Sequence, residues 1–295
     1  MIAVPSFTDT ENMADWAELS CIFSNKDSLS KAELLRALED AQVKDAEAVL
    51  ASIWLETERR SRLLPSKYPF DTEKSRLTIR NRSEVPLEYL FPLLLSRHHW
   101  YKSTKIKKAD WNRVSKLFEE YSTLAIRNYF QGKALTIGWP RNADLPQNFR
   151  QSINLVCESI KENQGTCSLM SRRPKDEGVD IIAWIPFPDN RPSKAIMLVQ
   201  CAAGQDYEEK ASEPHIATWN SFIDWRVRPI PALTFPFICT DELKWARLSS
   251  INESILFDRL RLAALCSFSE EDSATKKRIL DWVKHQANSL PKSEI

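Results

Sequence analysis

Glycine is scarce in this chain of 295 residues: there are only five, at positions 132, 138, 165, 178 and 204. Glycine serves where the backbone needs a positive φ or a close approach of another group. Because three of the five lie between residues 165 and 204, we expect the most demanding backbone geometry in that segment.

Signatures of several common protein classes are also missing. No pair of cysteines has the CxxC spacing of a zinc ribbon, and the six scattered cysteines are typical of buried thiols in a reducing compartment. No GxSxG, P-loop or GxGxxG motif occurs, which disfavours a serine hydrolase, an NTPase and a dinucleotide enzyme. The net charge of +1 argues against a strongly basic nucleic-acid coat but leaves a local basic face open.

Long hydrophobic runs are absent as well. The segment Met1–Ser6 lacks a basic region followed by an apolar stretch, so we expect no signal peptide. The longest uncharged apolar stretch, around residues 89–95, is too short to span a bilayer and contains Pro92. We therefore expect a soluble cytoplasmic protein with no membrane partner.

The sequence patterns that are present divide the chain into two regions. Residues 1–145 are mostly helical in pattern, and Ser30 with Glu33 forms a capping box at the start of one helix. The segment 138–146 breaks the pattern, so we place the domain boundary after residue 145. For residues 146–295 the expected elements are a helix over 149–160, strands near 166–170, 179–185 and 196–202, a helix over 207–225, a strand from 230, and helices over 249–265 and 273–289.

Two hydrophobic runs, 178–184 and 196–202, indicate buried strands, and each carries one polar side chain. The first holds Asp180 and the second holds Gln200. Burial of an unpaired carboxylate is costly, so some group must compensate Asp180, and a cation is one such group. Pairing with a nearby arginine or capping of a turn is the alternative for Asp180, and a buried Gln satisfied by the backbone is the alternative for Gln200.

These residues, in this order of elements, resemble the PD-(D/E)XK restriction-endonuclease-like superfamily over residues 149–240. The matching residues are Glu158 on the first helix, Asp180 on one strand and Gln200 on the next. The same strands are also similar to a group of bacterial proteins found near phage-defence genes. The resemblance implies an α+β or α/β protein, with a helical N-terminal region (1–145) followed by a restriction-endonuclease-like mixed sheet flanked by helices (146–295).

The resemblance also implies a DNA nuclease that uses Mg²⁺ or Mn²⁺ to offset charge on the scissile phosphate and to acidify a water. Asp180 and Gln200 would hold the metal and Glu158 would assist, since Mg²⁺ takes one or two carboxylates and keeps several waters. Because the chain has no ATPase motif, partner subunits would supply sensing or ATPase activity in a multi-subunit antiviral defence system.

The lysine that the family carries two residues after the Gln is missing, because that position is Ala202. Lys210, in the following helix, is the candidate for a displaced lysine, and Lys175 is a second possibility. A solvated Lys210 is the alternative. Loss of catalysis, leaving a subunit that binds nucleic acid or partner proteins, fits Ala202 equally well, and a helical adaptor with an incidental strand region ranks last.

Basic residues in two segments are candidates for contacts to nucleic acid. Arg172, Arg173 and Lys175 come immediately before the acidic strand and are placed to contact DNA phosphates. A second basic stretch covers residues 102–108. A solvated loop is the alternative for both stretches. The adjacent histidines at 98 and 99 point to different faces of a helix and have no third ligand at i+4, so we expect no metal there.

Overall fold

The computed structural model describes residues 1–6, 9–97, 107–141, 145–166 and 177–290. Contacts between residues divide the chain into two units. The first comprises residues 1–111, 237–240 and 276–295, and the second comprises residues 112–236 and 241–275. The boundary expected after residue 145 therefore falls inside the second unit, because the strand Lys133–Thr136 pairs with the strand Ile181–Trp184.

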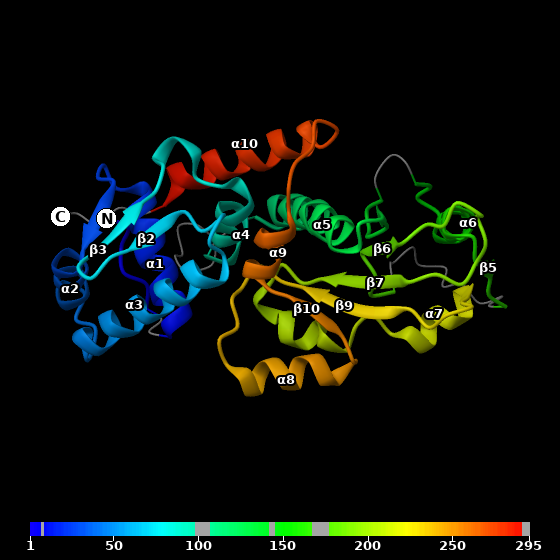
Figure 1. The fold of residues 1–295 in the computed structure, drawn as a ribbon, viewed down its shortest axis with the longest axis horizontal. Helices are drawn as coiled ribbons and strands as arrows, with labels where there is room; N and C mark the ends of the chain where they lie inside the picture. Colours follow the sequence, from blue (N-terminus) through cyan, green and yellow to red (C-terminus); the bar gives the residue numbers. More distant parts are fainter. Residues whose placement is uncertain (7–8, 98–106, 142–144, 167–176, 291–295) are drawn as a thin grey trace. The chain divides into compact units, whose positions relative to one another are not determined.

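The first unit combines helices with a small antiparallel sheet (Figure 1). Three short strands form this sheet in the order β1-β3-β2. The elements of this unit are α1 (Thr10–Phe23), β1 (Ser28–Ser30), α2 (Lys31–Asp40), α3 (Ala46–Leu63), β2 (Phe70–Thr72), β3 (Arg76–Ile79), η1 (Arg82–Glu84), α4 (Leu87–Arg97) and α10 (Ser273–Ser289).

The start of α2 shows why the sequence forms a helix there. The Ser30 hydroxyl accepts a hydrogen bond from the Glu33 backbone N–H at 3.2 Å, and the Glu33 carboxylate accepts one from the Ser30 N–H at 2.8 Å. These bonds satisfy amide groups that the first turn of a helix otherwise leaves without partners. The predicted capping box is confirmed.

A group of charged side chains is buried between α1 and α3. The Arg60 guanidinium is fully buried and donates to the carboxylates of Asp15 and Glu18. The two oxygens of Glu18 also accept hydrogen bonds from the hydroxyls of Tyr68 and Tyr89, each at 2.8 Å. The ions in this unit are thus compensated by one another, as burial of charge requires.

The apolar stretch at residues 89–95 forms most of α4 and is buried in the first unit. Pro92 lies inside this helix. Among the helices of the described residues, none is both long enough and apolar enough to cross a membrane.

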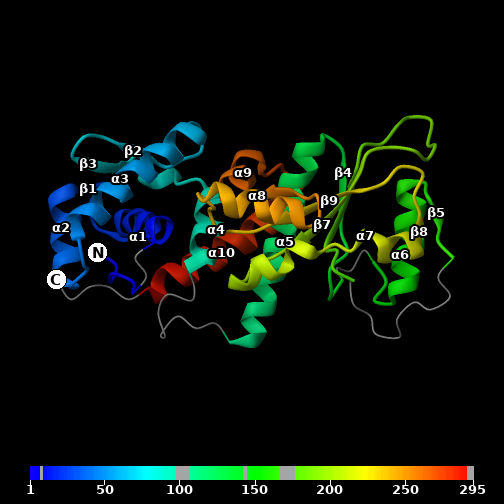
Figure 2. The ribbon, with the colours of Figure 1, turned by 90° about the horizontal axis from the view of Figure 1, so that it is seen from below.

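The second unit is built on a five-stranded sheet with the order β10-β9-β7-β6-β4. The strands β10, β9, β7 and β6 are labelled in Figure 1 and β4 in Figure 2. The pairs β4–β6 and β6–β7 are antiparallel, whereas β7–β9 and β9–β10 are parallel. This mixed sheet confirms the α/β character of the chain. The elements are α5 (Lys108–Phe130), β4 (Lys133–Thr136), α6 (Phe149–Ile160), β5 (Asn163–Gln164), β6 (Ile181–Trp184), β7 (Ile196–Cys201), η3 (Gln205–Ser212), α7 (Ile216–Phe222), β8 (Ile223–Asp224), β9 (Ile230–Thr234), α8 (Glu242–Ile251), β10 (Ile255–Phe257) and α9 (Arg259–Leu265).

The two strands expected from their hydrophobic runs are the centre of this sheet. All residues of β6 are buried, and so are the first five of β7. Ile182 and Leu198 face each other across the two strands and pack with α6 and α7 in one core. Burial on this scale is what the hydrophobic runs predicted.

Two predicted elements differ from the structure, and one strand was not predicted. A single helix was expected over 249–265, but the structure has the end of α8, the strand β10 and the helix α9 there. The strand forms because Ile255–Phe257 pairs with β9. The helix expected over 207–225 is η3, α7 and β8. The strand β4 was not predicted, and the strand expected near 166–170 lies almost wholly outside the described residues.

Candidate functional site

Asp180 comes immediately before β6 and is held on both sides by main-chain hydrogen bonds. Its N–H donates to the Val199 carbonyl at 2.8 Å, and its own carbonyl accepts from Ile137 N–H at 2.7 Å and Gly138 N–H at 3.1 Å. Its carboxylate Oδ2 accepts from the Cys201 N–H at 2.8 Å. The side chain, only 6% exposed, is therefore fixed at the junction of β4, β6 and β7.

Gln200 lies on β7 beside Asp180. The pairing of β6 with β7 ends at Ile181 and Val199, and the Asp180 N–H donates to the Val199 carbonyl, so Gln200 directly follows the residue that binds the Asp180 main chain. The Gln200 Oε1 atom is buried and has no hydrogen-bond partner among the described residues. Because an unsatisfied buried acceptor costs about 1–3 kcal/mol, this oxygen is available for a ligand that the protein itself does not provide.

A second carboxylate, from Glu119 on α5, reaches Asp180 at Gly138. A Cβ atom built on Gly138 would stand 2.5 Å from Asp180 Oδ1 and 2.5 Å from Glu119 Oε2. Asp180 Oδ1 and Glu119 Oε2 are therefore separated by no more than twice 2.5 Å. A side chain at position 138 would force the two carboxylates apart, and Glu119 is 8% exposed.

Lys116 provides the positive charge next to these acids. It lies one helical turn before Glu119, and its ammonium donates to Glu119 Oε2 at 2.6 Å and to the Gly138 carbonyl at 2.7 Å. Its side chain is 13% exposed. A lysine and a carboxylate from α5 and the carboxylate of Asp180, just before β6, therefore meet around Gly138. We call these three residues, together with Gln200 on the adjacent strand β7, the β6 cluster.

The Cys201 thiol lies close enough to the β6 cluster for the cluster to affect its pKa. Burial raises the pKa of Cys201 well above its ordinary value, and the negative charges of Asp180 and Glu119 raise it further. The hydroxyls of Thr234 and Ser122 lie near enough to lower this pKa, but by less. The thiol therefore stays protonated at neutral pH.

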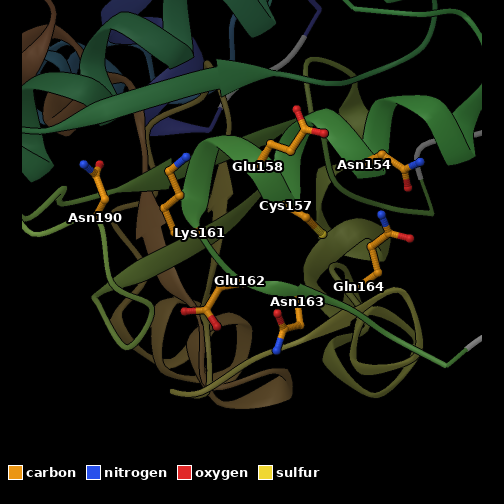
Figure 3. Close-up of a pocket in the computed structure, with 8 residues that line it drawn as sticks. All are labelled: Asn154, Cys157, Glu158, Lys161, Glu162, Asn163, Gln164 and Asn190. Carbon is orange, nitrogen blue, oxygen red and sulfur yellow. The ribbon is translucent and has the colours of Figure 1, made fainter.

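Glu158, the acid expected to assist Asp180, lies elsewhere. The helix α6 buries Ile153, Val156 and Ile160, and Glu158 is on its exposed side. It lines an open polar hollow of about 490 Å³ (Figure 3). That hollow is lined by Asn154, Cys157, Glu158, Lys161, Glu162, Asn163, Gln164 and Asn190, and neither Asp180 nor Gln200 belongs to this lining. The helical acid beside Asp180 is Glu119, because α5 rather than α6 brings a carboxylate to Gly138.

Lys210, the expected displaced lysine, is paired with another residue. Its ammonium lies 3.4 Å from the Glu213 carboxylate, and its side chain is 38% exposed. Ala202 is buried, and its N–H donates to the Thr234 carbonyl at 2.9 Å. The structure thus places Lys116, rather than Lys210, in contact with a carboxylate of the cluster.

The basic residues expected to contact DNA phosphates precede the described segment that contains Asp180. Arg172, Arg173 and Lys175 lie outside the described residues. The same holds for the histidines at 98 and 99 and for most of the basic stretch 102–108.

Sequence reasoning missed Glu119 and Lys116 because their helix was assigned to the N-terminal region. The available signal was weak but present: a Lys and a Glu three residues apart share one face of a helix. That helix is followed directly by β4, which pairs with the strand that Asp180 precedes.

Comparison of the chain with protein-family models, curated proteins and solved structures finds no match. Within the described residues, no three or more His, Cys, Asp and Glu side chains gather as a metal-ligand group. The oxygen donors of the β6 cluster are the carboxylates of Asp180 and Glu119 at Gly138 and the amide oxygen of Gln200 on β7.

Proposed function

We propose that this chain is a metal-dependent nuclease of the PD-(D/E)XK type that hydrolyses phosphodiester bonds in DNA. The observation that carries the proposal is the meeting of the Asp180 and Glu119 carboxylates and the Lys116 ammonium at Gly138. An acid before one central strand, a Gln on the next and a neighbouring lysine are the residue types that the sequence resemblance implies. Lys116 takes the role for which Lys210 was the candidate.

The donor set fits a hard divalent cation. Mg²⁺ binds oxygen, accepts one or two carboxylates and keeps several waters. Asp180 Oδ1 and the Glu119 carboxylate would supply the charge, and the buried Gln200 Oε1, which has no partner among the described residues, would supply a neutral ligand. When bound, Mg²⁺ or Mn²⁺ offsets charge on the phosphate and lowers the pKa of a water.

The protein's own residues position the reacting groups. The hydrogen bond from Cys201 N–H fixes Asp180 Oδ2 and leaves Oδ1 directed at Gly138. Glu119 and the Gly138 carbonyl hold the Lys116 ammonium at the edge of the cluster. From there Lys116 would orient the attacking water and stabilise the negative charge that develops on the phosphate.

The second candidate function is a catalytically inactive nuclease-like subunit that binds nucleic acid or partner proteins. Two residues favour it: Ala202, which stands where the family carries its lysine, and Gln200, which contributes no charge to a metal. In either case we propose that the chain works in a bacterial defence system with other subunits that supply sensing or ATPase activity.

The test is a cleavage assay with Mg²⁺ or Mn²⁺ on supercoiled plasmid, linear duplex DNA, single-stranded DNA and RNA. We expect cleavage of DNA by the wild-type protein and none in the presence of EDTA. The variants Asp180→Asn, Glu119→Gln and Lys116→Met should each lose about 10²-fold or more in rate. Circular dichroism should show that each variant remains folded.

The matched controls are Lys210→Met and Glu158→Gln, which change the same residue types outside the cluster. We expect both to cleave within about 2-fold of the wild-type rate, because surface substitutions have small effects. Full activity in Asp180→Asn would show that the site assignment is wrong. Loss of activity in Lys210→Met, with Lys116→Met unaffected, would transfer the lysine role to Lys210. Absence of cleavage by the wild type on all four nucleic acids would favour the inactive subunit.

Metal binding can be measured without turnover. A cation that binds only the folded state raises the melting temperature as its concentration increases. We expect this Mg²⁺- or Mn²⁺-dependent rise in wild type and Lys210→Met, and its loss in Asp180→Asn.

A further inference from the structure

The first unit contains a helix-turn-helix with a strand hairpin attached. The helices α2 and α3 are joined by a short turn, and β2 and β3 form the hairpin that follows, in a sheet ordered β1-β3-β2. This is the arrangement of a winged helix-turn-helix, in which the second helix of the pair is presented to a partner. The Trp54 indole N–H on α3 donates to the Glu73 carbonyl at 2.8 Å and so holds the hairpin loop against this helix.

One face of α3 is packed and the other is exposed. The buried side carries Leu50, Ile53, Trp54 and Thr57. The exposed side carries Glu47, Ala48, Ala51, Leu55, Glu58 and Arg62, which we call the α3 face. Leu55 lies at its middle and is 68% exposed.

The charge of the segment that holds the helix-turn-helix and its hairpin, residues 1–80, argues against duplex DNA as the occupant of the α3 face. Residues 1–80 contain eleven Lys and Arg and fourteen Asp and Glu, a formal net charge of −3. The first turn of α3 carries Glu47, and its N-cap residue is Asp45. Recognition helices place their first turns against base edges between two phosphate backbones, where acids at both positions would be repelled.

The α3 face is instead complementary to itself. Glu47 lies eight residues before Leu55, and Arg62 lies seven residues after it. If two such helices pack antiparallel about a two-fold axis at Leu55, each Glu47 meets the Arg62 of the other copy. Neither residue has an ion pair among the described residues, so both are available for this contact.

We propose that the α3 face joins two copies of this chain in an isologous, antiparallel helix pair centred on Leu55. Ala48 and Ala51 let the two helices approach closely, and the two Leu55 side chains bury one another. An isologous interface needs one patch that serves both partners. This patch has Ala51 and Leu55 at its centre and Glu47 at one end, with Glu58 and then Arg62 towards the other. Because a single helix pair is a small interface, we expect a weak dimer.

The test is sedimentation velocity on the full-length protein at concentrations up to about 100 µM, a range in which an interface of low affinity still assembles. We expect the wild type to shift from monomer to dimer as concentration rises. Leu55→Asp should stay monomeric, because it places a carboxylate at the centre of the pair. The matched control is Leu243→Asp, which changes an 84% exposed leucine of the second unit and should dimerise as the wild type does.

A charge swap tests the antiparallel register. Glu47→Arg and Arg62→Glu should each weaken the dimer at least tenfold, and the double variant should restore it, because the opposing charges are then exchanged between the two copies. Leu55→Cys should form an intermolecular disulfide on oxidation, beyond any cross-linking seen in the wild type.

The proposal is wrong if the wild type remains a monomer at every concentration. It is also wrong if Leu55→Asp dimerises normally. If the wild type is monomeric and binds a 20-base-pair duplex that Arg62→Glu no longer binds, the α3 face is a DNA-binding surface. None of these results depends on cleavage at the β6 cluster, so the two proposals fail separately.

Discussion

Arg60 is fully buried, and its guanidinium has partners on several sides. Its Nε donates to the Glu56 carboxylate at 2.7 Å, and one Nη donates to Glu18 at 2.8 Å. The same Nη donates to Asp15, and the other reaches the Glu11 carbonyl at 3.2 Å. Burial alone would lower the pKa of Arg60, but the charges of Glu18 and Asp15 raise it well above its ordinary value, so the buried guanidinium remains a cation.

We expect Arg60→Met to lower the free energy of unfolding by about 3–5 kcal/mol. It removes the arginine paired with buried Glu18 and leaves Asp15 and Glu56 with one arginine each. Urea denaturation is the measurement. Arg36→Met is the control, since the Arg36 side chain is 78% exposed and lies 3.8 Å from Asp40, a pair worth about 1 kcal/mol or less. Equal effects of the two substitutions would contradict the importance of the buried network.

Gly138 is the residue on which the geometry of the β6 cluster depends most. In Gly138→Ala the new methyl group would stand 2.5 Å from Asp180 Oδ1 and from Glu119 Oε2. Both atoms end side chains, so they can move apart at a cost of about 1–3 kcal/mol. We expect a folded protein that has lost both cleavage and the metal-dependent rise in melting temperature. Retention of both would show that the cluster tolerates wider separation.

The sequence allowed Asp180 and Gln200 to be selected because polar side chains interrupt apolar strands only at an energetic cost. Glu119 and Lys116 could not be selected in this way, because acids and lysines on helices are usually solvated. Their role depends on how α5 packs against the sheet, which is tertiary information. Glu158 had the right residue type on a helix, but α6 turns it away from the cluster.

At the scale of elements, patterns with a single physical interpretation were predicted well. The capping box predicted the start of α2, and the two hydrophobic runs predicted β6 and β7. Short apolar segments were predicted poorly, because helix and strand periodicity cannot be told apart over three or four residues. β10 and β4 are strands because neighbouring strands supply their hydrogen bonds.

The capping box of α2 makes an element-scale prediction. Ser30→Ala removes the hydroxyl that accepts from Glu33 N–H, so we expect a loss of about 1 kcal/mol in the free energy of unfolding. Ser30→Asp, which keeps an acceptor at the cap, should lose less. Urea denaturation of the three proteins measures the order, and an Asp variant no more stable than the Ala variant would contradict the capping role.

At the scale of the whole molecule, the two units both contain carboxylates whose pKa values are lowered by their partners. In the first unit, the hydrogen bond from Lys26 lowers the pKa of Glu33 to about 2. In the second unit, the hydrogen bond from Lys244 lowers the pKa of Glu208. Burial alone would raise the pKa of Asp272, but hydrogen bonds from Arg127 and Ser269 lower it.

These shifts set the sign of the pH dependence. A carboxylate with a lowered pKa in the folded protein stabilises it fully above the unfolded-state value, about 4, and loses this contribution as pH falls through the folded-state value. We expect a melting temperature that changes little between about pH 7 and 5 and falls below about pH 4. Asp272→Asn should melt at a lower temperature than the wild type, and this difference in melting temperature should be largest at neutral pH. The difference should shrink below about pH 4, because protonation of Asp272 removes the same charge from the wild type. Differential scanning calorimetry across this pH range measures the difference in melting temperature, with Glu158→Gln as the exposed control. A difference that stays constant down to about pH 3 would show that the charge of Asp272 does not contribute to stability.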